Sequence, residues 1–122
     1  KYMAATKTAK TFQASTTNTA GSTTTGTSVN LTTSYGCLMT AMITNGATGP
    51  TVGCDFVVRV SNDNFSADSK EIYRATAGVA NNAVTYFCFE LPASVMYAKS
   101  VFEGNTGQSV TVACTGDELT TI

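Results

Sequence analysis

The sequence predicts an all-β fold: a single antiparallel β-sandwich of jelly-roll or immunoglobulin-like type, with seven strands, or eight if the N-terminal segment pairs. Apolar and polar side chains alternate in several short runs, as expected for strands with one buried face. Glycine, asparagine and proline separate these runs in the manner of tight turns. No run follows a helical period for more than about two turns. Of the 122 residues, 23 are threonine, whose branched Cβ favours strands.

The expected strands follow one another from residue 28 onward. A row of Val, Cys and Phe side chains at every second position of 52–60 makes this run the clearest strand, with a partly polar second face. The runs 36–44 and 83–91 carry apolar side chains on both faces, and Pro92 ends the second. The remaining strands are expected to begin at 28–31 and to cover 70–75, 95–102 and 110–114, the last ending before the acidic pair 117–118.

The N-terminal segment differs from the rest of the chain in composition. Residues 1–34 are rich in Thr, Ser and Ala, contain Phe12 as the last aromatic residue before Tyr35, and include no acidic residue. Such a segment buries too little apolar area on its own to offset the entropy lost on ordering. We therefore expect 1–27 to be an extended or flexible arm, and 28–122 to be the β-sandwich domain.

Composition argues against several classes of function. The net charge of −1 provides no electrostatic attraction to nucleic acid or to an anionic membrane. The chain has no histidine, which removes Ser-His-Asp and Cys-His catalysis. We therefore expect no enzymatic activity, no catalytic residues, no cofactor, and no nucleic-acid or membrane partner.

The cysteines and the acidic residues do not indicate a metal site. Cys37, Cys54, Cys88 and Cys114 form no CxxC pair and lie inside β-rich runs, so we expect buried thiols, with two disulfides as the alternative. Asp63, Asn64 and Asp68 offer oxygen ligands for calcium, but they lack the spacing of an EF-hand loop and are typical turn residues.

The surplus of apolar sheet surface indicates function most directly. If both faces of 36–44 and 83–91 are apolar, one sandwich cannot bury them all, and another protein subunit must cover the remainder. The residues expected to make these contacts are Phe12, Val29 and Leu31 in the arm, and Met39, Met42 and Tyr97 on an oligomer face.

Several segments resemble small structural proteins of tailed bacteriophages. The resemblance covers about 28–113 and includes a Val-Arg-Val-Ser-x-Asp strand at 58–63, a Leu-Pro break at 91–92 and a Gly-Asn-Thr-Gly hairpin before Val-Thr-Val at 104–112. The other matching segments are SVNLTTSYG (28–36) and ITNGATGPT (43–51). The four cysteines and the long N-terminal arm depart from the pattern.

The resemblance implies a component of the virion, assembled in the cytoplasm of the host bacterium. It implies a capsid decoration (cement) protein or a head- or tail-attached sandwich, which forms homo-oligomers such as trimers and binds major capsid or tail proteins. Two alternatives remain. The chain could be a carbohydrate- or receptor-binding module of a tail fibre or tail tip, with stacking platforms at Tyr35, Tyr73, Tyr86 and Tyr97. It could also be a secreted adhesin or pilin-like subunit with oxidised cysteines.

Overall fold

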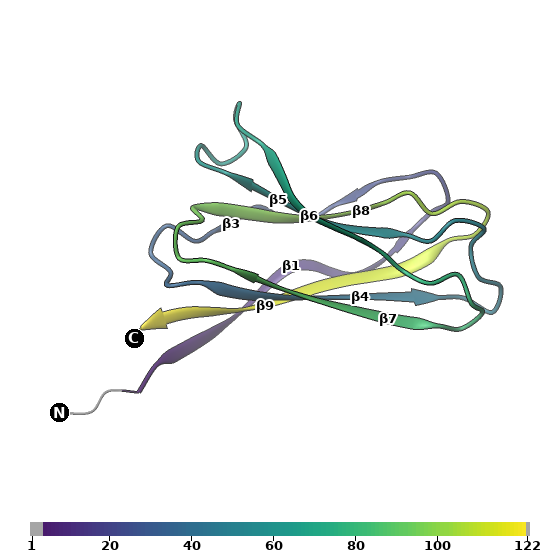
Figure 1. Ribbon diagram of the computed structural model, residues 1–122, viewed down its shortest axis with the longest axis horizontal. Coiled ribbons are helices and arrows are strands. Elements are labelled where there is room, and N and C mark those ends of the chain that lie inside the picture. The colour runs from purple at the N-terminus through teal and green to yellow at the C-terminus, as the bar shows by residue number, and fades with distance from the viewer. Residues whose placement is uncertain (1–3, 122) are drawn as a thin grey trace.

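The computed structural model describes residues 4–121 and confirms the predicted all-β sandwich (Figure 1). Sheet A has the strand order β1-β9-β4-β7 and is built from β1 (Thr6–Asn18), β9 (Val110–Thr121), β4 (Cys37–Asn45) and β7 (Val84–Leu91). Sheet B contains β8 (Tyr97–Glu103), β5 (Asp55–Ser61) and β6 (Lys70–Thr76), with β2 (Thr24–Thr25) and β3 (Val29–Asn30) pairing in turn with β8. All pairings are antiparallel.

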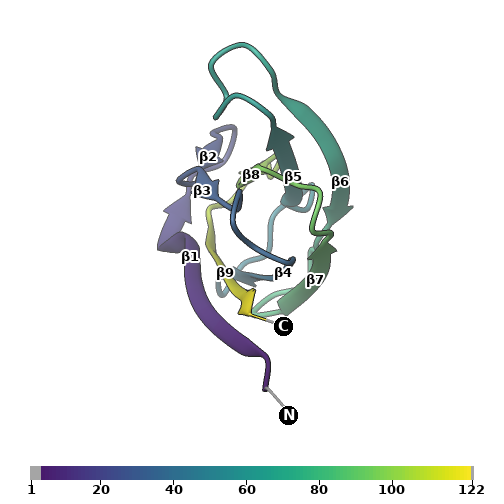
Figure 2. The ribbon, with the colours of Figure 1, turned by 90° about the vertical axis from the view of Figure 1, so that its left-hand side faces the viewer.

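This topology is that of a jelly roll. If β2 and β3 are taken as one interrupted strand, each sheet has four strand positions. Successive strands along the chain cross between the sheets, except β5 and β6, which are neighbours in sheet B. Figure 2, seen along the strands, shows the two sheets curving around a common interior, with β6 and β7 adjacent on one side. Within residues 4–121, no helix is long and apolar enough to cross a membrane.

The core forms where the alternating side chains of both sheets face each other. In β4, every second residue from Cys37 to Asn45 is buried, as the period of two predicts. Sheet B contributes Phe56 and Phe102, whose ring centroids lie 5.5 Å apart. Between β6 and β7, the ring of Tyr73 stacks on Phe89 at 4.6 Å and fills the gap between the sheets.

The segment expected to be an arm is largely part of the sandwich. Residues 6–18 of the predicted arm 1–27 form β1, which pairs with β9 along its length, while residues 1–3 lie outside the described part of the chain. The pairing register shifts on both sides of Gln13, so β1 is bulged near Phe12. The ring of Phe12 is fully buried over Gly116, where a side chain would collide with it. Backbone pairing and this one aromatic anchor therefore order a strand that has little apolar surface of its own.

The ends of two other strands differ from the expectation. β5 begins at Asp55 rather than at residue 52, because Val52 forms only an isolated bridge to Thr106 and is 52% exposed. β9 continues through the acidic pair to Thr121. Glu118 points inward and is buried, accepts a hydrogen bond from the Ser34 hydroxyl, and lies 3.5 Å from the Lys10 amine. Because the hydrogen bond and the ion pair compensate the carboxylate charge, Glu118 can be buried at an inward position of β9.

Candidate interaction surface

The outer face of sheet A carries apolar side chains that nothing among residues 4–121 covers. Met42 on β4 lies opposite Tyr86 on β7, and the neighbouring pairs place Val84 and Cys88 on the same face. Tyr86 is 64% exposed and Val84 48% exposed. We call Met42, Val84, Tyr86 and Cys88 the β4–β7 patch.

The patch exists because β4 and β7 are apolar on both faces, as their sequences predicted. Among the inward-facing residues of both strands, Met39, Ile43 and Leu91 are fully buried in the core. The outward-facing set is left at the surface, where a single chain gains no burial from it.

The patch borders an open sheet edge. β7 pairs with β4 on one side, and its other side has no partner strand among residues 4–121. The register between the two strands runs without interruption from Cys37–Leu91 to Thr44–Val84. A straight edge of this kind leaves backbone N–H and C=O groups available for an additional strand.

The six residues predicted to make subunit contacts lie in two environments. Phe12, Leu31 and Met39 are at most 2% exposed, and Val29 is 8% exposed, so all four pack in the core of their own chain. Phe12, Val29 and Met39 lie at inward positions of strands, and Leu31 directly follows a strand. Composition alone does not distinguish such inward positions from outward ones. Met42 and Tyr97 are partly exposed, but only Met42 belongs to the β4–β7 patch, because Tyr97 lies on β8 in sheet B.

The four cysteines are free thiols and are not equivalent. Cys37, Cys54 and Cys114 are buried as expected, whereas Cys88 is exposed on the outer face of β7. Burial raises the pKa of Cys37 to about 11 and the pKa values of Cys54 and Cys114 to about 12. These three thiols are therefore inert at neutral pH, and Cys88 is the accessible one.

The loop after β5 uses its acidic residues to hold its own backbone. The Asp63 carboxylate accepts hydrogen bonds from the Ser61 hydroxyl and from the backbone N–H groups of Ala67 and Asp68. These bonds, that of Ser61 first, lower the pKa of Asp63. No group of three or more acidic, Cys or His side chains able to hold a metal ion occurs in the described part of the chain. The Asp63 carboxylate therefore has the turn-forming role that its residue type predicts.

Comparisons with known proteins identify the fold and no family. No family model and no curated protein sequence matches the chain. Among solved structures, that of the Gx strain of infectious bursal disease virus is similar over 93% of this chain with a TM-score of 0.59 and 12% identity. The crystal structure of the VP2 subviral particle of the same virus has a TM-score of 0.56 at 10% identity. This chain spans about a third of the length of these viral chains, covering 32% and 33% of them.

A bacterial structure is similar over nearly its whole length. It is described as Bacillus endospore appendages that form a novel family of disulfide-linked pili, and the similarity covers 98% of this chain and 93% of that one. The TM-score is 0.52 and the identity 12%. At such identities the likeness shows the sandwich fold alone. The viral neighbours come from an animal virus, so the resemblance to tailed bacteriophages in particular is not shown.

Proposed function

We propose that the protein is a non-enzymatic structural subunit that acts by assembly, as a virion component that decorates a capsid and reinforces contacts between its subunits. Capsid chains are among the solved structures that share the fold, which supports this choice. Fold alone does not specify function, so the argument depends on the surface of this chain.

The β4–β7 patch is the observation that carries the proposal. Exposed Tyr86 and Val84 lie beside Met42, a residue that repacks easily against different partners. Aromatic and Met side chains are enriched at protein interfaces, whereas Lys, Glu and Asp are depleted there. The patch contains no charged residue, so burying it against another subunit desolvates no charge.

The proposed occupant of the patch is another copy of this chain, in a homo-oligomer such as a trimer that binds capsid or tail proteins. Copies that cover one another's patches gain the burial that one sandwich cannot provide, at about 25 cal/mol per Å² of apolar area. Such an oligomer presents several equivalent binding faces to a symmetric particle.

The test combines light scattering with a matched pair of variants. Tyr86→Lys places a charge in the patch, and Ile72→Lys places the same charge on sheet B, at a side chain that is 42% exposed. We expect the wild-type chain and Ile72→Lys to form the same oligomer in size-exclusion chromatography with light scattering, and Tyr86→Lys to be monomeric at the same concentration. Circular dichroism should show both variants folded, since both sites are exposed.

A wild-type chain that stays monomeric at high concentration and does not sediment with capsids or tails would exclude the proposal. An oligomer that Tyr86→Lys leaves intact would exclude the patch as its contact surface. The two outcomes are distinguishable, because the second retains assembly and moves the interface elsewhere.

An extracellular appendage subunit is the second candidate. The end-to-end match to the endospore appendage chain favours it, since the viral matches cover only a third of their own chains. Cross-linking between copies would have to use Cys88, the exposed thiol, because the other three are buried. This candidate predicts reducible multimers that Cys88→Ser abolishes, whereas four reactive thiols after denaturation of the isolated protein would exclude it.

A further inference from the structure

The charged side chains of residues 4–121 divide into two unequal groups. Every one of them except Lys7, Glu90 and Asp117 makes an ion pair, a side-chain hydrogen bond or a contact with an aromatic face. The engaged residues are Lys10, Asp55, Arg59, Asp63, Asp68, Lys70, Glu71, Arg74, Lys99, Glu103 and Glu118. The three that have no partner among the described residues come from three different strands and line the same cavity.

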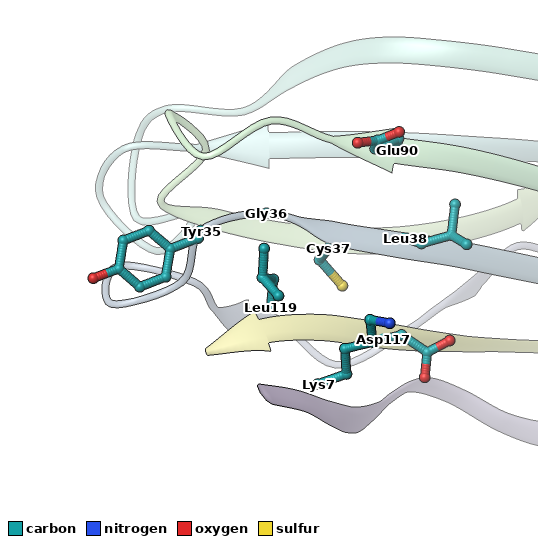
Figure 3. A pocket seen from close by; sticks show the side chains of 8 residues that line it. All are labelled: Lys7, Tyr35, Gly36, Cys37, Leu38, Glu90, Asp117 and Leu119. Carbon is teal, nitrogen blue, oxygen red and sulfur yellow. The ribbon is translucent and has the colours of Figure 1, made fainter. Parts of the chain in front are cut away.

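This cavity, of about 430 Å³, lies on the outer face of sheet A, near the ends of β1 and β9. Figure 3 shows the ring of Tyr35 at one end and the carboxylates of Glu90 and Asp117 on opposite sides farther along. Leu38 and Leu119 supply the apolar part of the lining. The Tyr35 side chain is 50% exposed, and its hydroxyl makes no hydrogen bond within the described chain.

Strand register holds the two carboxylates apart. Leu38 on β4 lies directly between its two register partners, Asp117 on β9 and Glu90 on β7. Adjacent strands are about 4.8 Å apart, so the Cα atoms of the two acidic residues are separated by about 10 Å. The exposed Leu38 side chain occupies the middle of this row.

The backbone at the start of β4 makes the hollow and fixes its aromatic wall. The Tyr35 N–H donates to the carbonyl of Leu119, and the Leu119 N–H donates to the carbonyl of Gly36. Gly36 has a φ of 127°, a value that non-glycine residues rarely adopt, and it leaves no side chain in the cavity. Two backbone hydrogen bonds to β9 therefore hold the chain at Tyr35 and Gly36 beside the cavity.

The lining excludes three kinds of ligand. Two carboxylates against one amine disfavour a phosphate, a sulfate or a nucleotide. A single calcium ion needs about six to eight oxygen ligands, whereas the lining supplies two carboxylates, and no group of three or more acidic, Cys or His side chains able to hold a metal ion occurs in the described part of the chain. A wholly apolar ligand would desolvate three charges without replacing their hydrogen bonds.

We propose that this cavity binds a neutral saccharide residue. A sugar ring presents an apolar C–H face to Tyr35 and the leucines, and hydroxyl groups that donate to Glu90 and Asp117. The Lys7 amine donates to a ring or hydroxyl oxygen. Hydrogen bonds to ionised groups are the stronger ones, and they fix the orientation of the sugar. This inference goes beyond the assembly function and shares no residue with the β4–β7 patch.

The probe is an array of neutral, sialylated and sulfated glycans, followed by calorimetry with the neutral glycan that binds best. We expect neutral glycans to bind and acidic ones to fail. Tyr35→Ala should weaken binding about tenfold through the loss of aromatic contact. Asp117→Asn and Glu90→Gln keep the shape of the cavity and should each weaken binding severalfold.

Tyr86→Ala is the matched control, since it removes an exposed tyrosine from the same face outside the cavity. It should bind the glycan as tightly as the wild-type chain. The absence of any glycan binding, equal loss in Tyr35→Ala and Tyr86→Ala, or binding of a Lys- or Arg-rich peptide in place of glycans would overturn the proposal. A negative result in the glycan experiments does not affect the test of assembly, because the light-scattering test depends on the β4–β7 patch and not on the cavity.

Discussion

The outer faces of the two sheets differ in how their side chains are satisfied. On sheet B, Arg74 binds three carboxylates, with its guanidinium nitrogens 2.7 Å from Asp55, 2.8 Å from Glu71 and 2.9 Å from Glu103. Arg59 also lies 4.0 Å from Glu71. On sheet A, the β4–β7 patch contains no charge, and the charged residues at its end have no partners within the described chain.

The difference indicates which side of the molecule works alone and which does not. The outer face of sheet B exposes a network of ion-paired charges to solvent, and these charges need no partner from another molecule. Sheet A shows apolar side chains and unpaired charges, two features for which a single chain provides no compensation. The same sandwich thus has one face that is complete and one that is suited to binding.

The largest expected effect on stability comes from a substitution on the inner, core-facing side of sheet A. Phe12→Ala removes the buried ring that anchors β1 over Gly116. Large-to-small substitutions of this kind cost about 3–5 kcal/mol, so the free energy of unfolding in urea should fall by that amount. Thr8→Ala, at an exposed position of the same strand, should change it by less than about 0.5 kcal/mol. Equal stability of the two variants would mean that burial of Phe12 does not hold β1 in the sandwich, as in the flexible form of the arm that composition predicts.

A smaller effect is expected from alkaline pH, which acts on the interior of both sheets. The pKa values of Cys37, Cys54 and Cys114 are raised from 9.0 to about 11, 12 and 12, so the unfolded state loses these protons first. Stability is therefore complete below pH 9 and falls as the pH rises toward 11. Denaturant unfolding at pH 8, 9 and 10 should show this decline.

Two variants assign the decline to buried thiols. Cys54→Ala removes one buried titrating group and should flatten the dependence on pH, whereas Cys88→Ser should leave it unchanged, since Cys88 is exposed. A slope that Cys54→Ala leaves unchanged would mean that Cys54 does not contribute to the decline.

The smallest effect on stability is expected from a substitution on the outer face of sheet B, where the charges are paired. Arg74→Ala breaks the ion pairs of sheet B, but they are exposed to solvent, and such pairs contribute little. We expect a loss of less than about 1 kcal/mol in thermal unfolding and an unchanged oligomeric state. A change of oligomeric state in Arg74→Ala would remove the contrast between the faces, because sheet B would then also be an interface.

The strands with strong alternation were predictable, and those that depend on a distant partner were not. β4 and β7 can be recognised in the sequence by local rows of apolar residues, such as Met39 to Ile43. β1 has only Phe12 and Asn18 fully inside, so nothing local marks it as a strand. β9 continues past residue 114 because Glu118 forms an ion pair with Lys10 and a hydrogen bond with Ser34, and both residues are remote in the sequence.

The candidate sites follow the same rule. The apolar outer faces of β4 and β7 could be read from their sequences, and with them the outward position of Met42. The cavity could not be found in this way, because Lys7, Glu90 and Asp117 meet only through the pairing of four strands. Tyr35, considered as a stacking platform from its residue type, proves to be its aromatic wall.

The edges of the two sheets limit how copies can be joined. The register of β1 shifts at three places, that of β6 shifts between Val58 and Arg59 of its partner strand, and β2 and β3 have two residues each. Among the described strands, only β7 offers a long, regular edge, so we expect sheet extension between two copies to use both of these edges and to end with the pair. On this expectation, a ring of three or more closes through side-chain contacts between faces rather than through a continuous sheet.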